Sequence, residues 1–534
     1  MRKTLEKEFT SIHVFNLRGN QRTSGELSRR EGGKIFGSGS RTPIAITILV
    51  KNPNKQTEKA EIFYHDIGDY LNREQKLEII SKFKSISNPA MTWQKLQPNE
   101  HGDWINLRND TFDTFFALAT KDKHKNSYFN FNSWGLKTNR DAWTYNSNKA
   151  TLEIKLSNMI QVYNTERKAY HNGTLRKFSD DPSKISWSAD LRKDLERNRE
   201  IRLNKTSFKA ALYRPFFKQV LYSDESLVER PGQVSKILPN QNTKNLMICV
   251  TGKGASKEFS CLMTNLTPNL DTLEKCQCLP LYYYEEVGGS QADLFESSYP
   301  YVRKDGISDF ILKEARNKYG DNSIEKEDIF YYVYGFLHSP GYRREFANDL
   351  KKSLPRLPLV DKVEDFWAFS KAGRKLADLH VNYEEVEPYE GVKVTGTQHG
   401  NYHVEKMRFG KKKVQIDGKT KTVDDKSIIY YNDQITIENI PEKAYEYVVN
   451  GKSAIEWIVD RYQIRTDKAS SITNDPNDWA KEVDNPRYIL DLLLSIINVS
   501  MQTVDIVNSL PRLTFEDRKT EVTEERILNG STEG

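Results

Sequence analysis

A turn rich in glycine and lysine is the feature of this sequence that most resembles a phosphate-binding site. In "NLMICVTGKGASKEF" (residues 245–259) an apolar run leads into Gly252 and Gly254. The dinucleotide-binding fingerprint requires a third glycine, but Lys257 stands at that position. A weaker possibility is that the backbone N–H groups after Gly254, with Lys253 and Lys257, hold one phosphate of a nucleic-acid backbone. The alternative interpretation is a tight turn between a strand and a helix.

Other cofactor, metal and catalytic motifs are incomplete. Gly418-Lys419-Thr420 fails as a P-loop because Lys413 stands where the first glycine is required. The nine histidines are scattered, without a His-Glu-x-x-His pattern, and no Gly-x-Ser-x-Gly elbow occurs. Cys276 and Cys278 have one residue between them, whereas zinc sites use two to four, and no matching pair follows. The sequence therefore predicts no metal site and no complete catalytic constellation.

The charge of the chain is modest overall but unevenly distributed. The net charge is +6, and residues 1–60 carry twelve Lys/Arg against five Asp/Glu. A second basic segment, "RFGKKKVQIDGKTKTVDDK", covers residues 408–426. Such local positive charge fits a polyanion, with duplex DNA or RNA as the default partner, although a solvated lysine-rich surface gives the same pattern.

Composition gives an expectation for the compartment. The mean hydropathy is −0.71, and we find neither a signal peptide nor a stretch close to the ~20 apolar residues of a membrane span. The four cysteines are too few for a disulfide framework in 534 residues. We therefore expect a cytoplasmic protein that does not contact membranes.

The elements that position these residues are predicted to form an α/β and α+β multidomain protein. A short helix over residues 1–9 precedes strands over 11–17, 43–50 and 60–67, and we expect helices over 72–83, 151–170 and 364–383. The strand that includes residues 44–50 lacks period-two alternation, which predicts a central strand covered on both faces. Asp417-Gly418 predicts a hairpin turn in the second basic segment. After Pro441 the pattern is mostly helical.

Several long blocks together resemble the C-terminal part of Type ISP restriction-modification enzymes. The first, residues 12–53, resembles the end of their adenine-N6 methyltransferase domain. The others lie along almost the whole chain: "GDWINLRNDTFD" (102–113), "LKTNRDAWTYN" (136–146), "YRPFFKQVLY" (213–222), "TGKGASKEFSCLMTN" (251–265), "GYRREFANDLKKSLPRLPL" (341–359) and "SAIEWIVDRYQIRTDKASSITNDPNDW" (453–479).

The resemblance implies a domain plan. Residues 1–68 would be the last strands of a Rossmann-like methyltransferase sheet, and residues 69–205 a mostly helical connecting region. Residues 206–440 would form a mixed α+β target-recognition domain, and residues 441–534 its helical C-terminal part. A sheet that starts at its later strands is expected to expose an edge and apolar side chains, so residues 1–65 should be loosely held or prone to association.

Two elements that the family uses for methyl transfer are not found in this sequence. Such enzymes bind S-adenosylmethionine on a glycine-bearing turn and act through an Asn-Pro-Pro-aromatic loop. The Asn-Pro pairs at positions 52, 88 and 485 are not followed by a second proline. We expect both elements to precede Met1 in a longer family enzyme. The chain alone is therefore expected to bind no cofactor, and whether it is an enzyme by itself is left open.

The resemblance also suggests residues for DNA contact. Phe36, on a glycine- and serine-rich loop before a strand, matches the aromatic residue that packs against a flipped adenine, and its alternative is an ordinary hydrophobic plug. Arg and Asn side chains read bases and Lys and Arg bind phosphates. The other candidates for DNA-facing roles are Arg41, Asn139, Arg140, Lys253 and Lys257.

The leading hypothesis is a double-stranded DNA recognition module of a Type ISP system. A second hypothesis is part of a working adenine-N6 methyltransferase that an upstream methyltransferase/helicase-nuclease polypeptide completes. A third is a relic that neither folds fully nor binds DNA.

Overall fold

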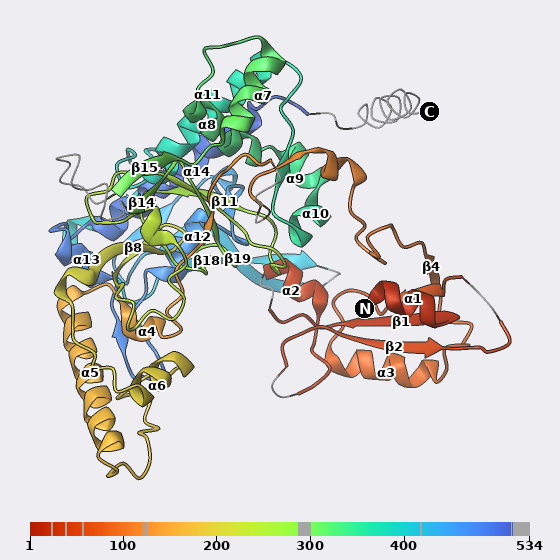
Figure 1. The fold of residues 1–534 in the computed structure, drawn as a ribbon, viewed down its shortest axis with the longest axis horizontal. Coiled ribbons are helices and arrows are strands. Elements are labelled where there is room, and N and C mark those ends of the chain that lie inside the picture. Colours follow the sequence, from red (N-terminus) through yellow and green to blue (C-terminus); the bar gives the residue numbers. More distant parts are fainter. Residues whose placement is uncertain are drawn as a thin grey trace. The chain divides into compact units, whose positions relative to one another are not determined.

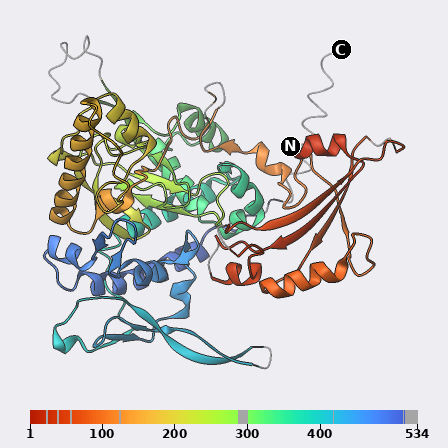
Figure 2. The same ribbon diagram turned by 90° about the horizontal axis from the view of Figure 1, so that it is seen from below.

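The computed structural model describes residues 1–534 except 23–24, 38–39, 56–57, 121, 123–125, 287–300, 417–418, 514 and 516–534, and it gives backbone only at 25–27, 416 and 419. Two compact units are formed, one by Met1–Thr114 with Glu345–Ser353 and the other by Phe115–Arg344 with Leu354–Gly534. The first unit holds one four-stranded sheet, and the second holds several small sheets and a helical C-terminal part (Figures 1 and 2). The predicted mixed α/β, multidomain class is confirmed.

The sheet of the first unit has the order β2-β1-β3-β4. Strand β1 (Ser11–Arg18) pairs antiparallel with β2 (Ile44–Val50) and parallel with β3 (Glu61–Asp66), which pairs antiparallel with β4 (Gln94–Leu96). Helix α3 (Arg73–Phe83) begins at Asn72, whose side chain accepts the Gln75 N–H in a capping box. The remaining helical segments of this unit are α1 (Arg2–Glu8), α2 (Gly25–Glu31), the 3₁₀ turn η1 (Asp110–Thr114) and α10 (Ala347–Lys352).

Strand β2 is an edge strand rather than a covered central strand, so that prediction is wrong for this chain. Its one neighbour among the described residues is β1. Ile46, Ile48 and Leu49 are each 39% exposed and Val50 is 38% exposed. These apolar side chains are exposed although the run has the composition of a covered strand, and the expected exposed apolar edge is present.

The second unit contains three four-stranded sheets, two of which are built from strands between Ser133 and Pro280. One has the order β11-β10-β13-β6 and the other β12-β8-β9-β7. The first is built from β6 (Ser133–Trp134), β10 (Met247–Val250), β11 (Cys261–Thr264) and β13 (Gln277–Pro280). The second is built from β7 (Tyr145–Asn146), β8 (Phe208–Arg214), β9 (Phe217–Tyr222) and β12 (Thr267–Pro268).

Smaller sheets and a long hairpin complete the strands of this unit. A third four-stranded sheet joins β17 (Lys393–Thr395), β20 (Thr436–Glu438), β19 (Lys419–Tyr430) and β18 (Arg408–Ile416) in that order. Strands β18 and β19 confirm the predicted hairpin, whereas its turn, Asp417-Gly418, lies outside the described residues. The two-stranded sheets pair β5 (Phe116–Ala117) with β16 (Arg356–Leu357), β14 (Tyr282–Glu286) with β15 (Tyr301–Asp305), β21 (Val448–Val449) with β22 (Lys452–Ser453) and β23 (Arg465–Thr466) with β24 (Thr473–Asn474).

Two helices of the second unit were predicted from amphipathic segments of the sequence. Helices α5 (Lys149–His171) and α11 (Val363–Val381) confirm these predictions, and α6 (Ala189–Glu196) is a shorter helix. The others are α4 (Asp141–Thr144), α7 (Asp309–Tyr319), α8 (Lys326–Leu337), α12 (Ala454–Arg461), α13 (Asn477–Glu482), α14 (Tyr488–Asn508) and α9 (Pro340–Glu345), whose last residue belongs to the first unit. Two glycines let α8 and α11 cross closely, because a Cβ on Gly335 would lie 2.1 Å from the Phe369 carbonyl oxygen and a Cβ on Gly373 1.9 Å from that of Tyr331.

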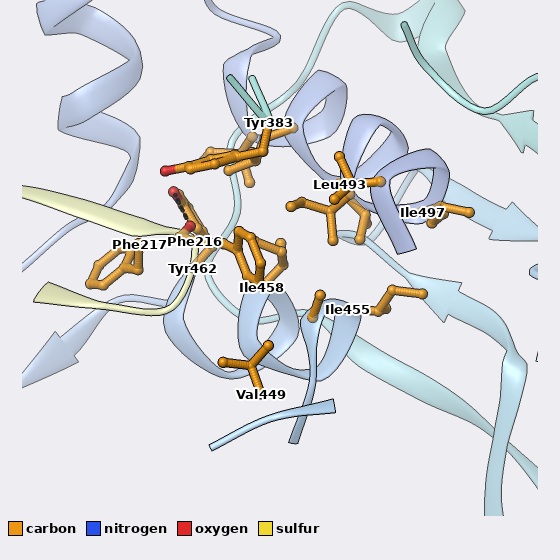
Figure 3. Packing of buried hydrophobic residues seen from close by; sticks show 14 of the residues in the cluster. Phe216, Phe217, Tyr383, Val449, Ile455, Ile458, Tyr462, Leu493 and Ile497 are labelled. Carbon is orange, nitrogen blue, oxygen red and sulfur yellow. Dashed lines mark hydrogen bonds between the residues drawn. The ribbon is translucent and has the colours of Figure 1, made fainter. Parts of the chain in front are cut away.

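The largest core cluster joins the C-terminal helices to the β8–β9 hairpin (Figure 3). Phe216 is fully buried at the hairpin turn, and its carbonyl oxygen accepts a hydrogen bond from Tyr462 Oη at 3.3 Å. Leu493 and Ile497 of α14 pack on Ile455 and Ile458 of α12. Burial of these aromatic and aliphatic side chains holds residues near 216 against helix α14, because apolar surface removed from water stabilises the folded chain.

Helix α14 corrects one expectation from the sequence. It is 21 residues long with a hydropathy of 1.5, which meets the length and composition of a membrane-crossing helix. In this structure 67% of the apolar stretch of α14 is buried inside the protein, as expected for a core helix. Two acidic residues, Asp491 and Asp505, interrupt the apolar run, and for this reason it was not recognised from the sequence as long enough to span a membrane.

Candidate nucleic-acid interface

The Gly252–Gly254 turn is closed by a carboxylate of the protein itself. Glu274 Oε2 accepts hydrogen bonds from the backbone N–H groups of Ser256 (3.0 Å) and Lys257 (3.1 Å) and from Ser256 Oγ (2.9 Å). Burial opposes ionisation, but these hydrogen bonds lower the pKa of Glu274. No helix directly follows the turn, whose next residues are all described. The amides that the sequence suggested for a phosphate are thus already occupied by an anion.

Lys253 and Lys257 differ in surroundings. Lys253 is exposed, and its carbonyl oxygen accepts a 3.5 Å hydrogen bond from Lys275 Nζ. Lys257 is half-buried, with its Nζ 5.7 Å from the centre of the Trp457 ring. Burial lowers the pKa of Lys257, although Glu274 acts in the opposite direction. Lys253 is therefore the better placed of the two for contact with an external phosphate.

Asn139 and Arg140 are adjacent in sequence but differ in exposure. Asn139 is exposed, has a positive φ of 56° and donates a hydrogen bond to Glu229. Arg140 is 5% exposed, and its guanidinium donates to the Leu227 carbonyl oxygen (3.2 Å) and to Ser188 Oγ (2.6 Å). Burial lowers the pKa of Arg140. Its contacts organise the domain interior, so a DNA contact by Arg140 would require these to break.

In the first unit, side chains of helix α3 form hydrogen bonds with the loop that carries Phe36. Arg73 Nε donates to the Ile35 carbonyl oxygen at 2.8 Å, and the buried Lys76 donates to the carbonyl oxygens of Glu31 (2.7 Å) and Gly33 (2.8 Å). Phe36 itself is 57% exposed. The loop is therefore anchored on one side of an aromatic ring that is free to stack.

Arg41 closes the same loop. Its side chain donates to the Gln21 carbonyl oxygen at 2.8 Å, and the Gln21 N–H donates to the Arg41 carbonyl oxygen at 3.0 Å. Arg41 remains exposed. Among the described residues the Arg41 guanidinium has one neutral partner, the Gln21 carbonyl oxygen, which leaves further N–H donors for a phosphate or a base.

The β18–β19 hairpin carries the second basic segment (Figure 2). Lys411 forms an ion pair with Asp424, and Lys412 Nζ lies 3.8 Å from Asp425 Oδ1. Lys413 and Lys421 are exposed and have no ion pair among the described residues. They stand opposite Thr422 and Val414, on opposite faces of the ribbon. Among the described lysines of residues 411–421, the two without an ion pair therefore lie nearer to the turn than the two paired ones.

A cavity of about 500 Å³ opens between the β7–β9 strands and the β23–β24 hairpin. Its floor contains Tyr145, Phe217 and Gln219, which are 3%, 4% and 3% exposed. Its rim contains the exposed residues Arg465 and Lys468. We call it the Gln219 cavity. A buried neutral floor below a cationic rim suits a planar, anionic ligand.

The Gln219 cavity was not predicted, although the sequence held a signal for it. Three of the blocks that carry the family resemblance, residues 136–146, 213–222 and 453–479, lie far apart in the chain and meet there. They supply Asp141 and Tyr145; Tyr213, Phe217 and Gln219; and Arg461, Arg465 and Lys468, respectively. None of the predicted residues Phe36, Arg41, Asn139, Arg140, Lys253 and Lys257 lines it.

A cluster of thiols was also missed. The sulfur atoms of Cys249, Cys276 and Cys278 all lie within 4.8 Å of one another, and all three residues are fully buried. The third thiol comes from β10, where Cys249 is the register partner of Cys278 in β13. Three buried thiols are donors for a soft metal ion, yet they also fit an apolar core, in which cysteine acts as a small hydrophobic residue.

The described part of the chain has a mixed α/β architecture, a basic hairpin and a cavity with exposed cations at its rim. The family model "Type ISP C-terminal specificity domain" matches residues 127–492. The chain belongs to this family of Type ISP restriction-modification proteins. A comparison with curated proteins gives no significant match.

Solved structures give the same relationship over nearly the whole chain. A nuclease-deletion mutant of the Type ISP restriction-modification enzyme LlaGI, in complex with a DNA substrate mimic, is 40% identical with a TM-score of 0.82, over 96% of this chain and 44% of that one. The ATP-dependent Type ISP enzyme LlaBIII bound to DNA is 36% identical with a TM-score of 0.83, over 96% and 32%. The DrdV–DNA complex is 28% identical with a TM-score of 0.79, over 96% and 49%. The chain thus spans less than half the length of each of these relatives.

Proposed function

We propose that this chain recognises a specific sequence in double-stranded DNA as the specificity part of a Type ISP restriction-modification system. The observation that carries the proposal is the match to the specificity-domain family over residues 127–492, with DNA-bound relatives that align over 96% of the chain. The exposed cations of the β18–β19 hairpin, together with Lys253, add an electrostatic surface for phosphates. Arg41 and Asn139 are the exposed candidates for contacts to DNA.

The experiment is selection of duplex sequences by the purified chain from a random library, followed by anisotropy titrations at several salt concentrations. We expect an enriched motif and an affinity for it at least about 10³-fold above that for unrelated duplex, with a negative slope of log K against log salt. Salt-dependent binding without an enriched motif would reduce the function to general DNA binding. Absence of any binding would refute the proposal.

A second candidate function is favoured by the exposed edge of β2. We propose that the sheet of the first unit continues a Rossmann-like methyltransferase sheet and that Phe36 stacks on an extruded adenine. In this arrangement S-adenosylmethionine and the Asn-Pro-Pro-aromatic loop belong to the rest of a longer enzyme or to a separate methyltransferase polypeptide. The chain by itself would then bind DNA without methylating or cutting it.

Methyl transfer from labelled S-adenosylmethionine tests this second function. The chain alone is expected to give no turnover, and mixing with a polypeptide that carries the two missing elements is expected to restore it. The Phe36→Ala chain should then restore much less activity than the Phe36→Tyr chain, because only the latter keeps an aromatic face. Equal activity of the two variants would contradict the stacking role.

A further inference from the structure

We propose that the Gln219 cavity binds one nucleotide, either free or as an unstacked unit of a DNA strand. The strand-borne form rests on the proposed function, whereas the free form does not. The volume of about 500 Å³ falls within the roughly 300–1,000 Å³ of small-molecule sites. Three independent features of the cavity define the ligand: an orphan acceptor on its floor, aromatic walls and cations at its rim.

The orphan acceptor is the carbonyl oxygen of Gln219. Ser147 N–H donates to Asn474 Oδ1 at 2.8 Å, which fixes that atom as an acceptor. Gln219 must then present its NH₂ group to the same oxygen, and it does so at 2.8 Å. Gln219 Oε1 is left buried, with no hydrogen-bond partner among the described residues. A buried acceptor without a donor costs about 1–3 kcal/mol, so a ligand N–H that reaches this oxygen would recover that cost.

Aromatic side chains form the wall beside this acceptor. Tyr145 and Tyr213 contact each other with ring centroids 4.7 Å apart, and Phe217 lies 6.3 Å from Tyr213. Asp141, at the same wall, already accepts hydrogen bonds from Thr138 Oγ1 (2.5 Å) and Asn269 Nδ2 (3.4 Å). The wall therefore offers apolar rings to a planar heterocycle. Every nucleobase also carries an N–H group that could donate to Gln219 Oε1.

The rim supplies cations for a phosphate. Arg465 donates to the carbonyl and carboxylate oxygens of Asp460 at 2.7 and 2.6 Å, so its guanidinium is held in place while its side chain stays 46% exposed. Lys468 is exposed and forms no ion pair with any described residue. The carboxylate of Asp467 also lines the cavity and is exposed, and its Oδ1 accepts hydrogen bonds from the N–H and Oγ of Ser470 at 2.8 Å each. A ligand with a base at the floor and a phosphate at the rim would be a nucleotide.

Calorimetric titration of the full chain tests this assignment. The probes are the four 2′-deoxynucleoside monophosphates, 2′-deoxyadenosine and inorganic phosphate. We expect the monophosphates to bind roughly 10-fold or more tightly than either fragment, because only they engage floor and rim together. Inorganic phosphate binding as tightly as the monophosphates, or no binding by any probe, would overturn the proposal.

Single substitutions test the floor and the rim of the cavity separately. Lys468→Ala and Gln219→Leu should each weaken monophosphate binding roughly 3- to 10-fold, and Lys313→Ala, an exposed lysine on α7, should leave it unchanged. Because Gln219→Leu also removes the bond to Asn474, its unfolding temperature is measured in parallel, and the exposed Lys468 serves as the variant that leaves the core untouched. Equal affinity of Lys468→Ala and the parent chain would contradict the rim assignment.

A short single-stranded oligonucleotide separates the two sources of the ligand. Displacement of a bound monophosphate by the oligonucleotide supports a strand-borne nucleotide, and failure of displacement supports a free nucleotide. Duplex binding in the absence of monophosphate binding would refute the cavity assignment and leave the proposed function intact. Monophosphate binding in the absence of duplex binding would refute the proposed function and support a free nucleotide in the cavity.

Discussion

Glu274 accepts a hydrogen bond from the backbone N–H of Lys257 at 3.1 Å, seventeen positions earlier in the chain. The same carboxylate oxygen accepts from Ser256 N–H at 3.0 Å. A carboxylate of the protein thus accepts hydrogen bonds from backbone N–H groups that the sequence motif suggested for a phosphate.

Removal of this carboxylate should destabilise the turn and open an anion site. Glu274→Ala is expected to lower the free energy of unfolding by about 1–3 kcal/mol in urea titrations, because two backbone donors lose an ionised partner. Added phosphate should restore part of this loss in the variant and not in the parent chain. Glu258→Ala, at an exposed neighbouring carboxylate, is the matched control. An unchanged unfolding curve for Glu274→Ala would show that the turn is held by other contacts.

The distal lysines of the β18–β19 hairpin should contribute more to DNA affinity than the proximal ones. Lys413→Ala with Lys421→Ala is expected to reduce the salt slope of duplex binding by about 0.9 for each phosphate that the variant no longer neutralises. Lys411 and Lys412 are already paired with Asp424 and Asp425, so substituting them should change the slope less. Anisotropy titrations across salt concentrations measure both. A larger effect for the paired lysines would contradict this electrostatic interpretation.

A buried histidine should make the second unit sensitive to acid. Burial lowers the pKa of His380 to about 3, and its ring hydrogen-bonds with Tyr334 Oη at 2.6 Å and Thr503 Oγ1 at 3.0 Å. The folded chain therefore keeps His380 neutral below pH 6.5, where the unfolded chain takes up a proton. The free energy of unfolding should fall by about 1.4 kcal/mol per pH unit between about pH 6 and 4 from this residue alone.

His380→Gln should make this pH dependence shallower by about one proton, whatever its effect on stability near neutral pH. The exposed His399 provides the control variant His399→Gln. Urea titrations at several pH values give the slopes. His338, whose pKa burial also lowers well below its ordinary value, adds to the slope of the parent chain and remains in both variants. Parallel slopes for His380→Gln and the parent would show that His380 is not buried in a neutral form.

The exposed edge strand should drive self-association of the chain. Ile46 and Ile48 lie two positions apart on the same face of β2, and each is 39% exposed. Ile48→Lys is expected to shift sedimentation toward the monomer, because a charge on an edge strand opposes pairing with another edge. Ile154→Lys, at a residue 62% exposed on helix α5, is the matched control and should change nothing. A parent chain that stays monomeric at all concentrations would contradict the prediction.

Much of the local structure was predictable because it depends on short-range patterns. The periodicity of residues 151–170 and the Asn72–Gln75 capping pattern specify helices α5 and α3 without reference to the rest of the chain. The hairpin of residues 408–430 follows from alternating residues around a turn motif. Burial could not be read in the same way: β2 has the composition of a covered strand, yet what covers a strand is decided by other elements.

The sequence by itself determined the family, several of the helices and the basic hairpin, since each rests on residues that are contiguous or in a recognisable order. The tertiary structure decided which charges are available. It buried Arg140, whose guanidinium donates hydrogen bonds to Leu227 and Ser188. It also placed Glu274 where its carboxylate accepts hydrogen bonds from the residues after the Gly252–Gly254 turn. It also brought Gln219 and Asn474 together across 255 positions and left Gln219 Oε1 buried, with no hydrogen-bond partner among the described residues. Hydrogen bonds between distant segments have no sequence period, so only the folded chain reveals them.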